Sequence, residues 1–428
     1  MSRQPHGGER YAPLVTGAET AALKEALLER FVRYAKICTT SDPKNEETPT
    51  TSGQWELARL LKDELAAVGV EAELTEHCYL IARIPSNLPP DVPVPETIGF
   101  LAHLDTSEDV PGNNVNPCVV RNYDGRNIVL QGGITLNPTE DADLAAAAGR
   151  TIVHTDGTTL LGADDKAGIA AIVCAADFLV RHDGIKHGPL EIIFTPDEET
   201  GKGLPCFPRE RIESSYCYTL DGGAGGEVEI ECFNAYGADV RFTGKTIHPG
   251  AAHGALVNAA LMAAHFAAML PRTESPEATD GYYGFYSLME ISGGLESASA
   301  RLIVRDFTDA GMTRRLAALE SFARAVEAAF PGGSVVIDAK PSYSNMKDAI
   351  DARPEALARL ESATERCGCG FRLKPIRGGT DGARLAELGI PAPNIFTGGR
   401  SFHSRAEWLL LEDLLDACRL VIELAAIR

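Results

Sequence analysis

The sequence predicts an α/β protein with a mostly parallel central sheet sandwiched by helices, plus an inserted α+β lid domain with one helix-covered sheet. The first observation is that short apolar runs alternate with helical patterns through the first half of the chain. The second is that several of these runs are apolar throughout, as expected for strands buried on both faces. The third is a change of pattern near residue 228, where strands begin to follow one another closely. The alternating pattern returns near the carboxyl end of the chain.

Composition limits the domain count and the classes of partner. A chain of 428 residues is too long for one ordinary core, so two or three domains are expected. It contains 44% apolar and 23% charged residues, and it has no run of about 18 apolar residues that would span a membrane. The net charge of −20 disfavours nucleic acid and anionic membranes as partners. The ten cysteines include no CxxC pair, and no hydrophobic signal core opens the chain, so we expect reduced thiols and a cytoplasmic location.

The elements of the first half follow from periodicity. Apolar residues at helical spacing predict helices around Leu23–Tyr34 and Leu57–Val68, the second ending at Gly69. Residues 105–150, rich in Asn, Gly and Pro, are predicted to form a long ordered excursion, and a helix is expected to begin near Lys166. The predicted strands are Val70–Leu74, Leu80–Ile84, Ile98–Ala102, Leu190–Phe194 and Tyr216–Leu220.

The second half predicts the lid and the return to the first domain. The pattern after residue 228 has the order β-β-α-β-β-α-β, and its first two strands are expected at Val228–Phe233 and Ala238–Phe242. The final segment contains helices from Pro354, Asp381 and Leu411. We therefore expect a catalytic domain made of residues 1–228 and 343–428, with the lid formed by residues 229–342.

Five short polar segments are spread over 300 residues, and most of them follow a predicted buried strand. The carboxyl ends of parallel strands meet along one crevice, which is where open α/β sheets bind ligands. These segments provide the imidazole and carboxylate ligands that catalytic zinc prefers. Their candidate residues are His103, Asp105, Asp164, Glu198, Glu199, Asp221 and His403.

The ligand chemistry assigns these residues to a pair of zinc ions. Two zinc ions about 3.5–4 Å apart need a bridging carboxylate, and we assign Asp164 to that role. His103 and Asp221 complete the first predicted site, and Glu199 and His403 complete the second. Each of the five segments also has an ordinary interpretation on its own, as a helix N-cap, a solvated acidic turn or a tight turn. Their joint occurrence in this order favours the metal site.

Two further carboxylates are assigned to supporting roles in the same site. Asp105 is placed to accept the free imidazole N–H of His103, which fixes the tautomer of that ring. Glu198 is predicted to be the general base, because its neighbour Glu199 binds metal while Glu198 faces the open side.

With these residues in place, the chain resembles the co-catalytic zinc exopeptidases, a family that includes carboxypeptidase G2, aminoacylase-like enzymes and dinuclear dipeptidases. The resemblance runs from about Leu28 to Ala425 and is closest to the tripeptide aminopeptidase branch. Its most specific stretches are Thr158-Thr-Leu-Leu-Gly-Ala-Asp-Asp-Lys-Ala-Gly168, Phe194-Thr-Pro-Asp-Glu-Glu199, Lys374-Pro-Ile-Arg-Gly-Gly-Thr-Asp-Gly-Ala383 and Asn394-Ile-Phe-Thr-Gly-Gly399. The sequence after His403, Ser404-Arg-Ala-Glu407, departs from the flank expected for the family.

The resemblance implies the same ligands, base and orienting aspartate, and it adds a cis peptide bond between Asp164 and Asp165. It implies that His248, which is otherwise an ordinary surface-loop residue, stabilises the oxyanion. It further implies that Arg305 binds the terminal carboxylate of the peptide. The remaining residues expected to face substrate are Arg377, Gly378, Gly379 and Asn345.

The predicted function is a zinc-dependent aminopeptidase that removes the first residue of tripeptides, using a zinc-bridging water and Glu198. Two Zn²⁺ ions per subunit are the expected cofactors, small peptides the partners, and a homodimer through the lid the assembly. Dipeptidases, carboxypeptidases and acyl-amino-acid hydrolases use the same kind of site, because site chemistry does not fix the substrate pocket. An inactive metal-binding homologue is a further alternative.

Overall fold

The computed structural model describes residues 13–428 and separates into two units, each described here by itself. The main unit runs to Ile230 and includes Ala349–Lys374 and Thr380–Arg428, while the inserted unit comprises Glu231–Asp348 and Pro375–Gly379. The inserted unit thus begins two residues after the predicted lid border at 229, ends six residues after the border at 342, and includes the separate segment Pro375–Gly379. Residues 1–12, which the first predicted segment includes, lie outside the described part.

The main unit is built around an eight-stranded sheet with the order β1-β2-β8-β3-β9-β16-β10-β15. Its centre, β8-β3-β9-β16, is parallel, while the pairs β1-β2, β2-β8 and β10-β16 are antiparallel and β10-β15 is parallel. All six residues of β3 and of β8 are buried, which explains why both strands are apolar almost throughout. The strands are β1 (Glu71–Leu74), β2 (Leu80–Ile84), β3 (Ile98–His103), β8 (Leu190–Thr195), β9 (Tyr216–Gly222), β10 (Glu227–Glu229), β15 (Arg372–Leu373) and β16 (Asn394–Phe396).

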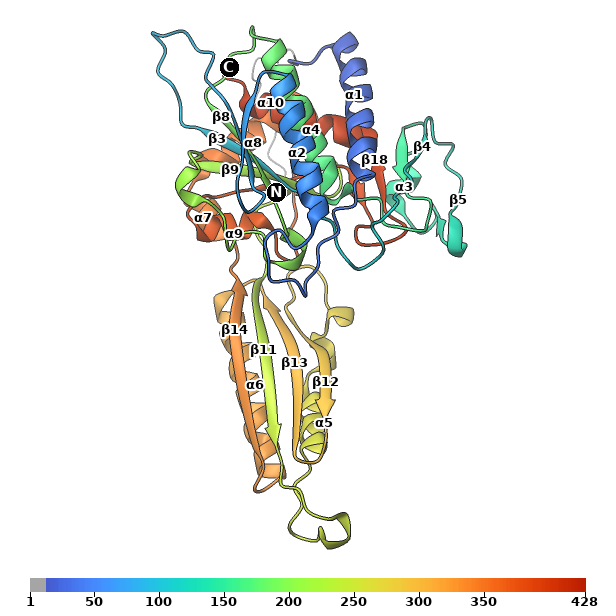
Figure 1. Cartoon of the computed structure of the whole chain (residues 1–428), viewed down its shortest axis with the longest axis vertical. Coiled ribbons are helices and arrows are strands. Elements are labelled where there is room, and N and C mark those ends of the chain that lie inside the picture. The colour runs from blue at the N-terminus through green and yellow to red at the C-terminus, as the bar shows by residue number, and fades with distance from the viewer. Residues whose placement is uncertain (1–12) are drawn as a thin grey trace, which may run out of the picture. The chain divides into compact units, whose positions relative to one another are not determined.

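Helices cover both faces of this sheet, as predicted. Helix α4 packs directly on β3 and β9, with α1 and α10 beside it (Figure 1). On the other face, Tyr79, Leu101 and Ile193 form a buried core with Leu385 of α9. The helices are α1 (Gly17–Ala35), α2 (Ser52–Ala67), α3 (Ala142–Ala146), α4 (Ala163–Arg181), α7 (Lys347–Asp351), α8 (Pro354–Cys367), α9 (Asp381–Glu387) and α10 (Leu411–Ala425), with 3-10 helices η1 (Gln131–Gly133), η2 (Glu198–Thr200) and η3 (Arg209–Arg211).

The predicted excursion over residues 105–150 has a small core of its own. Its strand β4 joins a second, four-stranded sheet, and Tyr123, Leu144 and Trp408 are buried together in one cluster. Trp408 comes from the carboxyl-terminal part of the chain, so the excursion packs against the segment that follows His403. The strands are β4 (Cys118–Val120), β7 (Ile152–His154), β17 (Gly399–Arg400) and β18 (Trp408–Leu410), with a separate hairpin of β5 (Ile128–Val129) and β6 (Thr135–Leu136).

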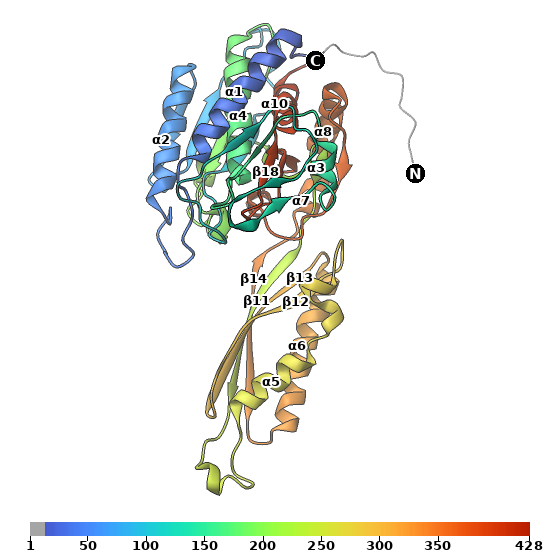
Figure 2. The same cartoon turned by 90° about the vertical axis from the view of Figure 1, so that its right-hand side faces the viewer.

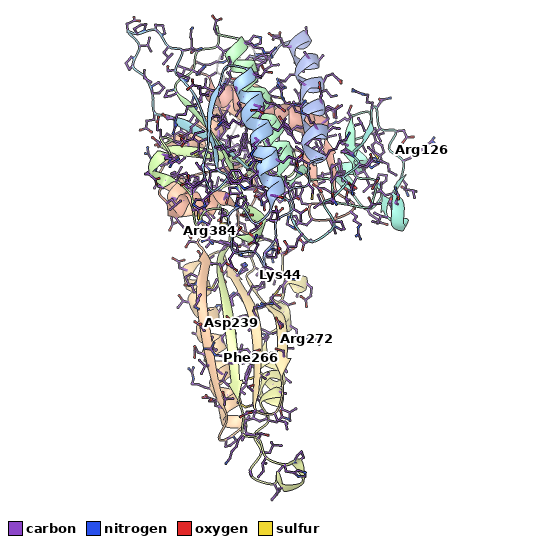
Figure 3. The ribbon with its side chains drawn as sticks, viewed as in Figure 1. Lys44, Arg126, Asp239, Phe266, Arg272 and Arg384 are labelled. Carbon is purple, nitrogen blue, oxygen red and sulfur yellow. The ribbon has the colours of Figure 1, made fainter. Side chains whose placement is uncertain are left out.

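The inserted unit is a four-stranded antiparallel sheet, β12-β13-β11-β14, with helices α5 and α6 on one face (Figure 2). Side chains alternate along β11, so Val240 and Phe242 are buried while Asp239 is exposed. Phe266 of α5 contacts the Phe242 ring edge-on, and both Asp239 and Phe266 can be located in Figure 3. The elements are β11 (Asn234–Thr243), η4 (Pro249–Ala251), α5 (Ala259–Met269), η5 (Arg272–Glu274), η6 (Pro276–Ala278), β12 (Phe285–Gly293), β13 (Ser297–Asp306), α6 (Asp309–Ala329) and β14 (Ser334–Tyr343).

One predicted strand of the lid was wrong. Val228–Phe233 was expected to open the lid, but its first part is β10, which pairs with β15 and β16 of the main sheet. The inserted unit therefore has the order β-α-β-β-α-β. An apolar run indicates a strand but does not specify its partners, and the partners of Val228 are Leu373 and Ile395, more than 140 residues away in the sequence.

Within residues 13–428, no helix combines the length and the apolar character needed to cross a membrane. All ten cysteines are free thiols.

Candidate metal centre

Three neighbouring parallel strands bring the predicted ligands to one edge of the main sheet. Strand β3 ends at His103, which is in register with Thr195 at the end of β8, and β9 carries Asp221 near its own end. Glu198 and Glu199 follow β8 in the short helix η2. The shared strand direction therefore produces the convergence that the sequence predicts.

Asp164 lies between the two histidines, with one carboxylate oxygen toward each ring. Its Oδ1 is 2.8 Å from Nε2 of His103, and its Oδ2 is 3.3 Å from Nε2 of His403. Nε2 of His103 is also 3.5 Å from Oδ1 of Asp221, and Nε2 of His403 is 3.0 Å from Oε2 of Glu199. The five predicted ligands thus form two overlapping sets that share one carboxylate, which is the arrangement a dinuclear site requires.

The Asp164–Asp165 peptide bond is cis, as the resemblance implies. Both residues have non-helical backbone angles at the start of α4. Asp165 is fully buried, and its carboxylate accepts hydrogen bonds from the backbone N–H groups of His103 and Gly168. The bridging position of Asp164 is therefore fixed by contacts of the following residue.

These residues fit metal ions by their donor set and by an unpaired oxygen. One ligand atom each from His103, Asp164 and Glu199 lie within 4.8 Å of one another, and the same holds for His103, Asp165 and Asp221. Oε1 of Glu199 is buried and has no hydrogen-bond partner among the described residues. A buried carboxylate oxygen without a donor is costly unless a cation binds it.

The protonation of the metal-free site reflects its crowded negative charge. Burial raises the pKa of Glu199 to about 8, with a further contribution from the charge of Asp164. Burial and the same charge raise the pKa of Asp221 to about 6. Hydrogen bonds to Asp164 and Glu199 raise the pKa of His403 to about 12. Protons thus compensate part of the negative charge in the metal-free protein, and metal ions would displace them.

The carboxylate of Asp105 contacts both His103 and the backbone of the Glu198–Glu199 segment. Oδ1 of Asp105 is 3.3 Å from Nδ1 of His103, and the two carboxylate oxygens of Asp105 accept the N–H groups of Glu198 and Glu199. One buried aspartate therefore orients both a histidine ligand and the segment that holds the predicted base. Burial, together with the charges of Asp221, Asp381 and Glu199, raises the pKa of Glu198 well above its ordinary value. A carboxylate with a raised pKa suits proton transfer near neutral pH.

The two predicted lid residues belong to the inserted unit. His248 is exposed and caps η4, where its Nδ1 accepts the N–H of Gly250. Arg305 is half-buried on β13, and its guanidinium donates to the carbonyl oxygens of Tyr236 and Val304 and lies over the ring of Tyr343. Their roles in oxyanion and carboxylate binding stay predictions.

The residues expected to face substrate have definite partners within the inserted unit. The guanidinium of Arg377 donates to the carbonyl oxygens of Thr279, Gly281 and Tyr283 and lies over the rings of Phe233 and Phe285. These contacts fix the loop that contains Gly378 and Gly379. At Gly379 a Cβ would lie 2.8 Å from the Tyr343 ring, whereas at Gly378 it would meet nothing within 4 Å.

Asn345 has a structural role that sequence reasoning did not find. Its Oδ1 accepts the N–H groups of Cys232 and Lys347, and its Nδ2 donates to the carbonyl oxygen of Phe307. The amide thereby ties together segments near both ends of the inserted unit. Its predicted contact with the peptide backbone stays a prediction, and it would require these bonds to be shared.

Several residues that contact the ligands were also missed. Oδ2 of Asp109 is 2.9 Å from Nδ1 of His403. The hydroxyl of Thr380 donates to Oδ2 of Asp221, and Asn394 accepts the N–H of Asp221. For Asp109 no sequence signal exists, because it lies in the irregular excursion. For Thr380 and Asn394 the signal was their presence in two of the stretches that carry the resemblance.

Comparison with known proteins shows the family of the chain. Residues 147–426 match the model of Peptidase family M20/M25/M40. Peptidase T of Clostridium perfringens strain 13 is 44% identical over 400 residues, covering 93% of this chain and 98% of that protein. Peptidase T of Listeria monocytogenes is 44% identical over 406 residues, with 94% and 98% covered.

Solved structures share the fold. Aminopeptidase PepT from Bacillus cereus has a TM-score of 0.72 and 24% identity, covering 94% of this chain and 98% of that chain. A tripeptidase from Staphylococcus aureus has the same TM-score with 20% identity, covering 94% and 97%. The family match and the identity to these peptidases lead to one conclusion: the chain belongs to the M20/M25/M40 family of peptidases.

Proposed function

We propose that the protein is a tripeptide aminopeptidase that uses two zinc ions. The observation that carries the proposal is the position of Asp164 between His103 and His403, with Glu198 beside the same cluster. The names of the relatives support the choice of substrate class, since they include Peptidase T and a tripeptidase. The imidazole and carboxylate donors support zinc as the metal.

In this proposal His103, Asp164 and Asp221 hold one ion, and Asp164, Glu199 and His403 hold the other. When bound, zinc supplies a water of lowered pKa and polarises the peptide carbonyl. Glu198 would take a proton from the attacking water, whose oxygen bonds to the peptide carbonyl carbon, and would give that proton to the amine nitrogen as the C–N bond breaks. Its raised pKa supports both steps, because the same carboxyl must hold the proton between them.

Two further residues are proposed to bind the substrate. The free amine of the first residue lies at the metal centre, and the far carboxylate pairs with Arg305. A guanidinium binds a carboxylate through two parallel hydrogen bonds, which gives direction as well as affinity. His248 donates to the developing oxyanion.

We also propose a cytoplasmic location and a homodimer formed through the lid. The ten free thiols support the first, because disulfides are rare in the reducing cytosol. Exposed apolar side chains on the edge strand β12, namely Leu288, Met289 and Ile291, support the second. Sedimentation velocity measures the assembly directly, and a monomer at micromolar concentration contradicts the dimer.

The test combines metal content with activity on one purified sample. Metal is measured by mass spectrometry and Leu-Gly-Gly hydrolysis by amine release, before chelation, after chelation and after zinc is restored. We expect two zinc ions per chain, loss of activity on chelation and its return with zinc. Leu-Gly and N-acetyl-Leu-Gly-Gly serve as matched substrates, because only an aminopeptidase for tripeptides needs both a free amine and three residues. Two bound metals with faster cleavage of Leu-Gly or of the acetylated peptide contradict the substrate class, and absence of metal contradicts the site.

A further inference from the structure

Helix α4 begins without a side-chain cap of its own. Its N-cap residue is Gly162, which has a left-handed backbone (φ 79°) that suits glycine. Glycine has no side chain to accept the free N–H groups of the first turn. Asp164, the shared ligand of the proposed metal centre, lies in that turn. The way these N–H groups are bonded therefore affects a ligand directly.

Glu407 caps this turn from 245 residues away in the sequence. Its Oε2 accepts the N–H groups of Leu161 at 2.6 Å and Gly162 at 2.9 Å, and its Oε1 accepts that of Ala163 at 2.7 Å. A longer contact of 3.4 Å joins Oε1 to the N–H of Asp164. Glu407 is only 1% exposed, so this is a buried carboxylate enclosed by consecutive N–H groups.

The backbone of Glu407 is also held by hydrogen bonds. Glu407 lies four residues after His403 and immediately before β18. Its backbone N–H donates to the carbonyl of Ser404, and its carbonyl oxygen accepts the N–H of Thr155, the residue directly after β7 of the second sheet. His403 itself has φ of 57°, an uncommon backbone conformation for a histidine that needs support from its surroundings. Glu407 therefore connects the Asp164 turn with the His403 turn.

The other ligand segments are held by the same kind of contact. Asp105 accepts the N–H groups of Glu198 and Glu199, and Asp165 accepts that of His103. In each case a buried carboxylate binds the backbone of a segment that carries a ligand. Glu407 does this for the turn that carries the shared ligand, and, like Asp165, it was not among the site residues predicted from the sequence.

We propose that Glu407 is a positioning residue of the metal centre, which fixes the Asp164 turn relative to the His403 turn so that both side chains meet one ion. This inference rests on the proposed function, because it concerns ligands of the same site. Hydrogen bonds to a charged acceptor are stronger than neutral ones, and losing the acceptor leaves several buried donors unpaired. A ligand whose turn is less well fixed binds its ion more weakly.

The test substitution is Glu407→Gln, which keeps the side-chain shape and removes the charge. The amide has one accepting oxygen, and its NH₂ group faces N–H donors that it cannot bind. The matched control is Glu412→Gln on α10, since the Glu412 carboxylate also accepts a backbone N–H, that of Thr151, but contacts no ligand segment. Glu407→Asp keeps the charge on a shorter side chain, and it serves as the second variant if Glu407→Gln does not fold.

Two measurements on metal-free protein test the inference without relying on activity. Zinc titration against a chelator gives the affinity for each ion, and hydrogen exchange gives the protection of the amides of residues 161–164. For Glu407→Gln we expect affinity for one of the two ions to fall about 10- to 100-fold and these amides to exchange faster. The zinc affinity and the exchange rates of Glu407→Asp should lie between those of Glu407→Gln and the parent. Glu412→Gln should match the parent in both.

Turnover gives an independent readout. We expect kcat for Leu-Gly-Gly to fall more than KM rises in Glu407→Gln, because substrate contacts are untouched. Faster amide exchange with unchanged affinity for both ions overturns the inference and leaves Glu407 as a helix cap only. Unchanged exchange overturns it as well. If the parent protein binds no zinc, the proposed function fails, while the exchange measurement still reports whether Glu407 holds the turn.

Discussion

At the scale of single residues, Glu198 and Glu199 are adjacent in the chain but have different surroundings. Their N–H groups bind the two oxygens of Asp105, so the backbone of the pair is fixed at both positions. The side chain of Glu199 reaches His403 at 3.0 Å. Burial raises the pKa of Glu198, and the charges of neighbouring carboxylates raise it further. In the proposed function, Glu199 is therefore a metal ligand while the adjacent Glu198 carries the proton.

Substituting the proposed base tests this separation. In Glu198→Ala we expect metal content to stay at the parent value while turnover of Leu-Gly-Gly falls by about 10²- to 10⁴-fold, the usual contribution of a general base. Metal content by mass spectrometry and initial rates check both parts. Loss of one metal ion in this variant means that Glu198 is a ligand, and this result contradicts its assignment as the base.

Arg305 offers a second test at this scale. Arg305→Ala removes a guanidinium that we propose pairs with the peptide's terminal carboxylate. We expect KM for Leu-Gly-Gly to rise by about 10-fold or more with a smaller change in kcat, since a charge-assisted bond contributes about 1.5–3 kcal/mol. Leu-Gly-Gly-amide is the control substrate, and its KM should rise much less. An equal loss for both peptides contradicts the carboxylate-binding role.

At the scale of elements, the approach of α4 to the sheet fixes the distance between two ligand segments. Gly168 faces β9 so closely that a Cβ would lie 2.0 Å from the carbonyl oxygen of Leu220 and 2.4 Å from Oδ1 of Asp165. Leu220 precedes Asp221, and Asp165 follows Asp164. The missing side chain at this position therefore allows the bridging ligand and Asp221 to lie close together.

Gly168→Ala tests that packing. Neither neighbouring atom can move away easily, because one belongs to the backbone and the other to a buried carboxylate. We therefore expect the free energy of unfolding to fall by about 1–3 kcal/mol or more. Gly184→Ala is the control, since that glycine is exposed and has nothing within 4 Å. Denaturant unfolding of metal-free protein compares the two. Equal stability of the two variants contradicts the proposed close packing.

At the scale of the whole molecule, excess negative charge links stability to pH. Glu199 has a pKa raised from 4.5 to about 8, and His403 has one raised from 6.5 to about 12. At pH values between its ordinary and its raised pKa, each group binds more protons in the folded than in the unfolded chain. Folded stability from these groups is therefore present at low pH and is lost as pH rises. The lowered pKa of Asp164 acts in the opposite sense, but only below about pH 4.

We therefore expect the Tm of metal-free protein to fall as pH rises from about 5 to 8. Thermal unfolding followed by circular dichroism in the presence of a chelator measures this directly. The zinc-loaded protein should show a smaller dependence, because metal ions replace the protons that compensate the carboxylates. A Tm for metal-free protein that rises across this interval contradicts the proposed protonation.

The sequence by itself determined the fold class and the set of proposed ligands that the structure brings together. Runs such as Leu190–Phe194 are apolar because both faces of the strand are covered, and this property can be recognised without knowing the partners. His103, Asp221 and Glu199 follow such runs, so the rule that parallel strands end at one edge was enough to bring them together. The resemblance added the residues of the lid, whose roles stay predictions.

Only the tertiary structure decided contacts between segments that are distant in the chain. The run Val228–Phe233 was predicted to open the lid, but its first part forms β10, where Val228 pairs with Leu373 and Ile395 of the main sheet, because strand pattern does not encode strand partners. Glu407 was noted only as part of an unusual flank, yet it holds the turn before Asp164. The backbone N–H groups that it binds are the same in every residue type. For that physical reason a sequence does not reveal which carboxylate will bind them.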